Sequence, residues 1–290
     1  MALFLRGQVN RSKPTPIMSK IQMISKRAEI HPGAILGENV VVEAFARIDR
    51  DVVIGDGSWV GANAAIYPGA RIGTHCRIYP GAVIAGEPQD LKYRGEYSMV
   101  EIGDHTTVRE YATINRGTDS KGVTRVGSHT LLMAYSHLGH DVTVGNHCVI
   151  SNSVQVAGEV QIEDFAIIGG MSAIHQFCRV GAYAFVSGMT GILSDVAPYT
   201  KVFGIPASFM GINTLGLTRR GFSREQVETI SEAYRILYQK GLNTTQALEA
   251  MEATLTASPE LEYIIGFIRS SRRGVIKTVI RNGGVAQKAI

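Results

Sequence analysis

The segment LLMAYSHLGHD at residues 131–141 places two histidines and a carboxylate, His137, His140 and Asp141, within five positions. Imidazole titrates near neutral pH, so a histidine here could act as the general base that removes a proton from a hydroxyl group. A neighbouring carboxylate could orient the ring and stabilise its protonated form. These residue types at this spacing predict proton transfer of the kind that acyl transfer requires.

Covalent catalysis is not expected, because the sequence has no GxSxG nucleophile elbow. The three cysteines, Cys76, Cys148 and Cys178, lie far apart and form no CxxC pair, so neither a disulfide framework nor a cysteine-based metal site is predicted. We therefore expect direct acyl transfer without a covalent acyl-enzyme. The same cysteine pattern favours the reducing cytoplasm.

The sequence around these residues follows a six-residue repeat, in which an aliphatic residue occupies every sixth position over 30–84, 102–114 and 126–192. This period fits neither an α-helix nor simple strand alternation, so the repeating unit is a short strand plus a turn. Three units would form one triangular coil with the aliphatic side chains inside. Glycine often follows the aliphatic position, as at Gly55 and Gly127, where we expect corners with positive φ.

The six-residue repeat has two polar interruptions, at about 85–101 and 115–125. They are predicted to be loops inserted into a β-helix that spans 23–205. In solenoids, insertions gather on one face and often build the binding surface.

The periodicity becomes helical after about residue 205, which predicts a helical C-terminal domain at 206–290. Ser223 and Gln226 fit a capping box, a second helix is expected near 245–255, and a third should start at Pro259.

Composition supports a folded chain of 290 residues, with 45% hydrophobic and 19% charged residues. No apolar run is long enough to span a membrane, so no stable membrane insertion is expected. The net charge of +4 is matched by a basic C-terminal region that could attract an acidic protein or polyphosphate. Nucleic acid is not an expected partner, because no binding motif or interleaved aromatic residues accompany the charge.

Residues 1–22 are basic and fit a disordered extension, an upstream start site or a transit peptide.

Five ordered motifs resemble those of the bacterial UDP-N-acetylglucosamine 3-O-acyltransferases of the hexapeptide-repeat family. The likeness covers residue 23 to the end of the chain, and its motifs are GEPQDLKYRGE (86–96), INRGT (114–118), LLMAYSHLGHD (131–141), DFAIIGGMSAIHQFCRVGA (164–182) and LTRRGFSRE (217–225). The resemblance implies a mostly β fold, a left-handed parallel β-helix followed by a small α-helical domain. It also implies a homotrimer with active sites between neighbouring prisms, and a role in lipid A biosynthesis.

The resemblance further implies a role for individual residues. His140 would deprotonate the glucosamine 3-hydroxyl, Asp141 would orient His140, and the Gly158 N–H would occupy the oxyanion position. The donor would be a 3-hydroxyacyl chain on acyl carrier protein, whose phosphopantetheine belongs to that partner, so no cofactor is expected. Contacts to UDP-N-acetylglucosamine and the acyl group are expected from Asp90, Lys92, His137, His175, Gln176, Asn213, Arg219 and Arg220.

Gly188 matches the position at which this family measures acyl length, so its missing side chain predicts room for a long acyl chain. Two positions depart from the family pattern. Glu159 stands where the family often has a histidine near the substrate, and Leu215 stands where it often has an acidic residue near the nucleotide. These departures leave a UDP-3-amino-sugar open as an alternative acceptor.

Three rival functions remain at this point. A later-pathway N-acyltransferase shares the solenoid and the histidine base, but usually carries an added N-terminal substrate-binding domain, for which about 22 residues leave no room. A zinc hydratase of the hexapeptide-repeat class would show an HxxxxH pair, yet no two of the eight histidines lie five positions apart, so no metal site is predicted. A non-enzymatic scaffold is disfavoured by the HLGHD cluster and both loops.

Overall fold

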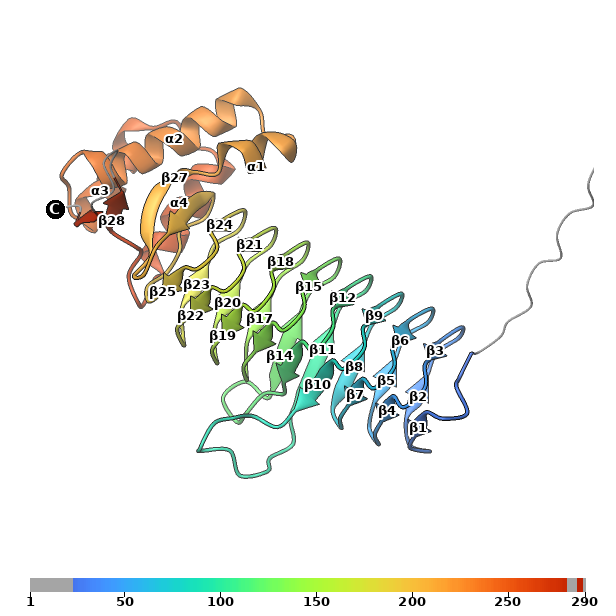
Figure 1. The fold of residues 1–290 in the computed structure, drawn as a ribbon. Coiled ribbons are helices and arrows are strands. Elements are labelled where there is room, and N and C mark those ends of the chain that lie inside the picture. The colour runs from blue at the N-terminus through green and yellow to red at the C-terminus, as the bar shows by residue number, and fades with distance from the viewer. Residues whose placement is uncertain (1–22, 281–285, 289–290) are drawn as a thin grey trace, which may run out of the picture.

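The computed structural model describes residues 23–280 and 286–288, so the prediction for residues 1–22 lies outside the described residues. The chain forms a column of very short strands, capped at its C-terminal end by helices (Figure 1). Two long loops leave the column on the same side, near β10 and β14 (Figure 1). These two loops and the strands beside them position the site described below.

Within the described residues, the strands form three sheets that run along the column. The nine-stranded sheet contains β1 (Glu29–Ile30), β4 (Arg47–Ile48), β7 (Ala65–Ile66), β10 (Val83–Gly86), β13 (Thr113–Asn115), β16 (His137–Leu138), β19 (Gln155–Val156), β22 (Ala173–Ile174) and β25 (Gly191–Ile192). The eight-stranded sheet contains β2 (Ile35–Leu36), β5 (Val53–Ile54), β8 (Ala70–Ile72), β11 (Met99–Ile102), β14 (Val123–Val126), β17 (Thr143–Val144), β20 (Gln161–Ile162) and β23 (Arg179–Val180). The twelve-stranded sheet contains β3 (Val41–Val42), β6 (Trp59–Val60), β9 (Arg77–Ile78), β12 (Thr107–Val108), β15 (Leu131–Leu132), β18 (Val149–Ile150), β21 (Ile167–Ile168), β24 (Phe185–Val186), β26 (Thr200–Phe203), β27 (Ser208–Ile212), β28 (Thr278–Ile280) and β29 (Ala286–Lys288).

Successive strands from β1 to β25 visit the three sheets in turn, so each coil has three edges. The first edge joins the nine- to the eight-stranded sheet, the second joins the eight- to the twelve-stranded sheet, and the third returns to the nine-stranded sheet. Strands of neighbouring coils pair in parallel, for example Leu138 with Val156. The predicted parallel β-helix with a helical C-terminal part is confirmed.

The aliphatic side chains of the six-residue repeat fill the interior of the column, as predicted. Every aliphatic residue of this repeat from Val42 to Ile192 is at most 3% exposed. Ile30 and Leu36 are only half-buried, because within the described residues the first coil has a neighbouring coil on one side only. Stacked branched side chains fit this narrow interior, and their burial is the main stabilising contribution along the column.

The prediction that a positive φ explains the glycines that follow the aliphatic positions was wrong. Neither Gly55 nor Gly127 has a positive φ; instead, left-handed backbone falls two residues later, at Gly57 with φ of 67° and at His129 with φ of 55°. A Cβ on Gly127 would lie 2.6 Å from the carbonyl carbon of Gly145 in the next coil. Glycine is needed because coils about 4.8 Å apart leave no room for a side chain there.

The C-terminal region holds four helices among the described residues, α1 (Thr214–Arg219), α2 (Arg224–Gln239), α3 (Thr244–Thr254) and α4 (Pro259–Arg269). The capping box of Ser223 and Gln226 and the start at Pro259 are confirmed. The short α1 was not predicted, and the expected boundary near 205 falls inside the antiparallel β26–β27 hairpin. Tyr234 of α2 donates to the Pro198 carbonyl at 2.6 Å, which fastens the helices to the last coil.

Candidate active site

The histidine cluster and both inserted loops lie at the first edge of the prism. The loops follow β10 and β13, and His140 follows β16, so all three leave the nine-stranded sheet at the same edge. One coil contains eighteen residues, which stacks His140, Gly158 and Gln176 above one another. The repeat therefore brings these residues together although they are distant in sequence.

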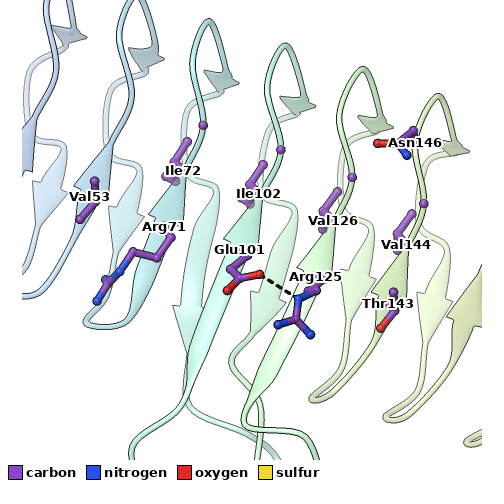
Figure 2. A pocket seen from close by; sticks show the side chains of 14 residues that line it. Val53, Arg71, Ile72, Glu101, Ile102, Arg125, Val126, Thr143, Val144 and Asn146 are labelled. Carbon is purple, nitrogen blue, oxygen red and sulfur yellow. Dashed lines mark hydrogen bonds and ion pairs between the residues drawn. The ribbon is translucent and has the colours of Figure 1, made fainter.

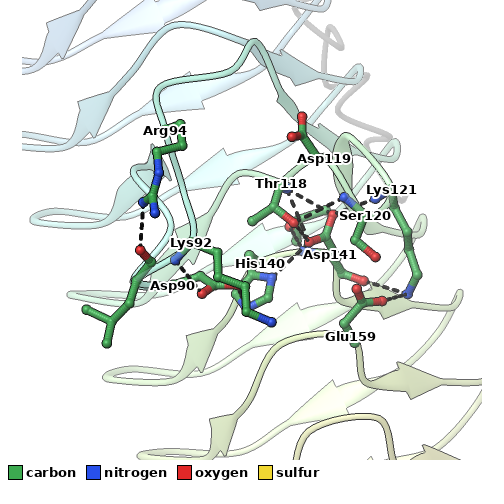
Figure 3. A network of polar contacts seen from close by, with 12 residues as sticks. Asp90, Lys92, Arg94, Thr118, Asp119, Ser120, Lys121, His140, Asp141 and Glu159 are labelled. Carbon is green, nitrogen blue, oxygen red and sulfur yellow. Dashed lines mark hydrogen bonds and ion pairs between the residues drawn. The ribbon is translucent and has the colours of Figure 1, made fainter.

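His140 and Asp141 form a hydrogen-bonded dyad, with Nδ1 of His140 2.8 Å from Oδ2 of Asp141 (Figure 3). Asp141 is fully buried and accepts hydrogen bonds from the Thr118 N–H at 3.0 Å, the Thr118 hydroxyl at 2.6 Å and the Lys121 N–H at 3.2 Å. A carboxylate only accepts, so Nδ1 carries the proton that it donates to Asp141. In the neutral ring, this arrangement leaves the lone pair of Nε2 available as a base.

A cavity of about 540 Å³ opens beside the dyad. Six of the predicted residues line it together, namely Asp90, Lys92, His137, His140, Gly158 and Gln176. Oδ2 of Asp90 lies 3.9 Å from Nε2 of His140, and Oδ1 of Asp90 accepts the Lys92 N–H at 2.9 Å. The loop after β10 thus covers the cavity with one acidic and one basic side chain.

Gly158 packs directly against the imidazole of His140. A Cβ at this position would lie 2.3 Å from Nε2, so only glycine leaves the ring in place. The φ of Gly158 is not in the left-handed region, so contact and not backbone strain requires glycine here. Among the residues that the structure describes, the Gly158 N–H donates to no other group. It can therefore serve a group inside the cavity.

His137 projects from β16 into the same cavity, and its Nδ1 lies 2.7 Å from the Thr113 hydroxyl. Burial lowers the pKa of His137, because desolvation disfavours the charged ring. His137 is therefore neutral near pH 7. A neutral imidazole suits a hydrogen-bonding role better than that of a second cation.

The other predicted residues do not line this cavity. His175 is exposed at the first edge, one coil beyond Gly158, and its Nδ1 approaches the Gln176 carbonyl at 3.1 Å. Gly188 is exposed at the third edge, between β24 and β25.

Three further predicted substrate contacts, Asn213, Arg219 and Arg220, lie near the second edge, and the family resemblance implies that Asn213 and Arg220 hold the uridine nucleotide. Asn213 caps α1 and donates through Nδ2 to the Tyr183 carbonyl at 2.9 Å. The guanidinium of Arg220 lies over the Phe165 ring, 4.5 Å from its centroid, and Arg219 is exposed in the last turn of α1. The predicted site residues of one chain therefore lie on three different edges of the prism.

The two departures from the family pattern have different surroundings. The side chain of Glu159 is 10% exposed, and its carboxylate pairs with Lys121 at 2.9 Å, beside a separate cavity of about 660 Å³. Leu215 is 62% exposed on α1. Glu159 is thus occupied by a contact within the chain and does not line the His140 cavity.

Four residues around the site were not singled out from the sequence: Thr113, Asn115, Thr118 and Lys121. Thr118 ends the INRGT motif, which could have drawn attention to it. The contact of Lys121 with Asp141 could not be predicted, because the loop after β13 interrupts the six-residue repeat and no regular spacing relates its residues to the coils. Asn115 lines the cavity and donates through Nδ2 to the Glu87 carbonyl at 2.7 Å.

The cysteines offer no nucleophile. All three are buried, and burial raises the pKa of the Cys148 thiol to about 12 and that of Cys178 to about 11. Thiols in such surroundings stay protonated and unreactive near neutral pH. Across the described part of the chain, no group of histidine, cysteine and acidic side chains is arranged to hold a metal ion.

A further cavity of about 490 Å³ runs across the outer face of the eight-stranded sheet (Figure 2). Its wall includes the Glu101–Arg125 ion pair, with the Arg125 Nε 2.8 Å from the Glu101 carboxylate (Figure 2). None of the predicted site residues lines this surface.

Comparisons with known proteins agree with this geometry. Residues 195–276 match the model of the second domain of UDP-N-acetylglucosamine O-acyltransferases, and residues 51–86 and 124–158 match the bacterial transferase hexapeptide repeat. A curated acyl-[acyl-carrier-protein]–UDP-N-acetylglucosamine O-acyltransferase of Pseudomonas entomophila is 40% identical over 255 residues, which are 88% of this chain and 99% of the relative. The chain belongs to the UDP-N-acetylglucosamine O-acyltransferase family. A relative of the same name from Anaeromyxobacter dehalogenans is 50% identical over 193 residues, 66% of this chain and 75% of the relative.

Solved structures of the O-acyltransferase family support the same fold. The crystal structure of a UDP-N-acetylglucosamine acyltransferase from Bacteroides fragilis superimposes with a TM-score of 0.86 at 52% identity, over 88% of this chain and all of that chain. With the hexapeptide repeats, this likeness confirms the predicted left-handed parallel β-helix. Among the described helices, none is long and apolar enough to cross a membrane.

Proposed function

We propose that this chain transfers a 3-hydroxyacyl group from acyl carrier protein to the 3-hydroxyl of UDP-N-acetylglucosamine, the first step of lipid A biosynthesis. Membership of the O-acyltransferase family supports the substrates. The observation that carries the proposal is the His140–Asp141 dyad, whose free Nε2 faces the cavity beside Gly158.

The proposed reaction is a direct attack on the thioester. Nε2 of His140 takes the proton from the 3-hydroxyl as its oxygen bonds to the thioester carbonyl carbon. The resulting oxyanion accepts a hydrogen bond from the Gly158 N–H, which has no other acceptor among the described residues. The tetrahedral intermediate then expels the phosphopantetheine thiolate, which recovers the proton from the protonated ring. Asp141 orients His140 and stabilises its charge through both half-reactions.

The remaining side chains have roles that follow from their positions. Asp90, Lys92, His137 and Gln176 line the cavity and are proposed to hold the sugar and the acyl group. Asn213, Arg219 and Arg220 near the second edge are proposed to hold the uridine nucleotide, with His175 as a further substrate contact. The enzyme is proposed to need no cofactor or metal of its own, since phosphopantetheine arrives with the donor.

A homotrimer is part of this proposal. The predicted residues lie on three edges of one prism, and residues on different edges of a prism face away from one another. Neighbouring copies would place the second or third edge of one chain beside the first edge of the next. One composite site would then hold the dyad, the nucleotide contacts and Gly188. We further propose a cytoplasmic location, which fits the three free cysteines.

The test incubates purified protein with a panel of 3-hydroxyacyl carrier proteins and either UDP-N-acetylglucosamine or its 3-amino analogue, and identifies products by mass spectrometry. O-acylation of UDP-N-acetylglucosamine is expected, by a species that native mass spectrometry shows to be trimeric. Acylation of the amino analogue alone would replace the acceptor. Intact trimers that acylate neither sugar would contradict the proposal.

A further inference from the structure

Lys121 makes three contacts at the back of the dyad. Its N–H donates to Oδ1 of Asp141 at 3.2 Å, and its ammonium donates to the Asp141 carbonyl at 2.9 Å. The same ammonium lies 2.9 Å from Oε2 of Glu159 (Figure 3). One side chain from the loop after β13 thus joins Asp141 to a residue of the next coil.

Glu159 is tied to the other half of the site. It directly follows Gly158, the glycine that contacts His140, and its own N–H donates to the His140 carbonyl at 3.0 Å. The side chain of Glu159 is 10% exposed, whereas that of Lys121 is 29% exposed. A carboxylate this buried requires a charged partner, since an unpaired charge out of water is costly.

We propose that Lys121 and Glu159 form a positioning pair, which locks the coil bearing the His140–Asp141 dyad onto the coil bearing Gly158. This inference rests on the proposed function, because it takes His140 as the base and Gly158 as the oxyanion donor. The pair fixes the spacing between base and oxyanion donor, and that spacing decides how well both groups meet the transition state.

The pair acts through the dyad and not on the sugar. Lys121 and Glu159 line the cavity of about 660 Å³, together with Arg179 and Arg273, whereas His140 and Gly158 line the separate cavity of about 540 Å³. Loss of the pair should therefore change the rate of the chemical step more than the affinity for the acceptor.

The experiment compares Lys121→Met, Glu159→Gln and the double variant, each as an intact trimer. We expect Lys121→Met to lower kcat about 10- to 100-fold, with KM for UDP-N-acetylglucosamine within about threefold of wild type, because the base shifts by a fraction of an ångström. Adding Glu159→Gln should recover about fivefold or more of kcat, since no buried carboxylate then remains unpaired.

The matched control removes another ion pair between coils, with Arg125→Met and Glu101→Gln. This pair joins β14 to β11 on the exposed face of the eight-stranded sheet and should leave kcat unchanged. Wild-type kcat in Lys121→Met, a loss confined to KM, or a double variant no faster than Lys121→Met would each overturn the proposal.

A second readout does not depend on the reaction. The N–H groups of Thr118 and Lys121 both donate to Asp141, so their hydrogen exchange reports how firmly the carboxylate is held. Exchange at both amides should accelerate at least about tenfold in Lys121→Met and partly recover in the double variant. Unchanged exchange would overturn the positioning role. If the wild-type protein acylates no sugar, the proposed function fails while this exchange result still decides the structural claim.

Discussion

Replacing Gly158 with alanine tests the contact on which the catalytic geometry depends. The added Cβ would lie 2.3 Å from Nε2 of His140, whereas ordinary contacts begin at 3.4 Å, so the ring must move by about 1 Å. The ring is held by the 2.8 Å hydrogen bond to Asp141, which such a movement would break. A displacement of about 1 Å can cost about 10²-fold in rate, or about 2.7 kcal/mol in the activation barrier.

The assay measures kcat under saturating donor and acceptor, with trimer mass and melting temperature recorded for each variant. Gly55→Ala is the control, because its Cβ would meet the Gly73 carbonyl carbon at 2.7 Å in a coil without site residues. Gly55→Ala should lower the melting temperature but keep the kcat of folded enzyme, whereas Gly158→Ala should lose kcat while remaining folded. A Gly158→Ala enzyme with near-wild-type kcat would show that the contact between Gly158 and His140 does not set the catalytic geometry.

Three further predictions concern the same edge and the acyl chain. Asp141→Asn should lower kcat by up to about 10⁴-fold, because an amide favours the wrong imidazole tautomer; single-turnover rates within threefold of wild type would disprove this. Gly188→Met should shorten the preferred donor, since the exposed position admits a side chain that has only the Gly170 carbonyl, 3.2 Å from its Cβ, to displace; competition between mixed-length donors, read by mass spectrometry, checks it. His137 has a pKa lowered by burial, so the unfolded chain binds a proton more readily and stability falls as pH drops below about 6.5. The melting-temperature advantage of wild type over His137→Asn should therefore shrink between pH 7.5 and pH 5, and an unchanged difference would contradict it.

The scaffold was predictable because its signal in the sequence is periodic. An aliphatic residue every sixth position leaves one way to bury all of them, and Leu138 and Val156 are in register because a coil contains eighteen residues. His140 and Gly158 are also eighteen residues apart, so the same repeat stacks one on the other. Handedness had no such basis in spacing, and it came from the family resemblance.

The contacts made by loops could not be derived in this way. Thr118 and Lys121 hold Asp141 from a segment without a period, where no rule relates sequence distance to spatial distance. The glycine error has a similar origin, because sequence shows that a position must be small but not whether φ or a neighbouring backbone demands it. Likewise, the assignment of Gly188 and Arg220 to other edges than His140 emerges only once the three sheets are traced.

The central claim is that Nε2 of His140 removes the proton from the acceptor hydroxyl. The most direct measurement compares the kcat of wild type and His140→Ala, together with calorimetric binding of UDP-N-acetylglucosamine to both trimers. We expect kcat to fall by about 10²-fold or more while acceptor binding changes little, because a general base contributes to the transition state and not to the ground state. A His140→Ala trimer that acylates the sugar at close to the wild-type rate would show that His140 is not the general base.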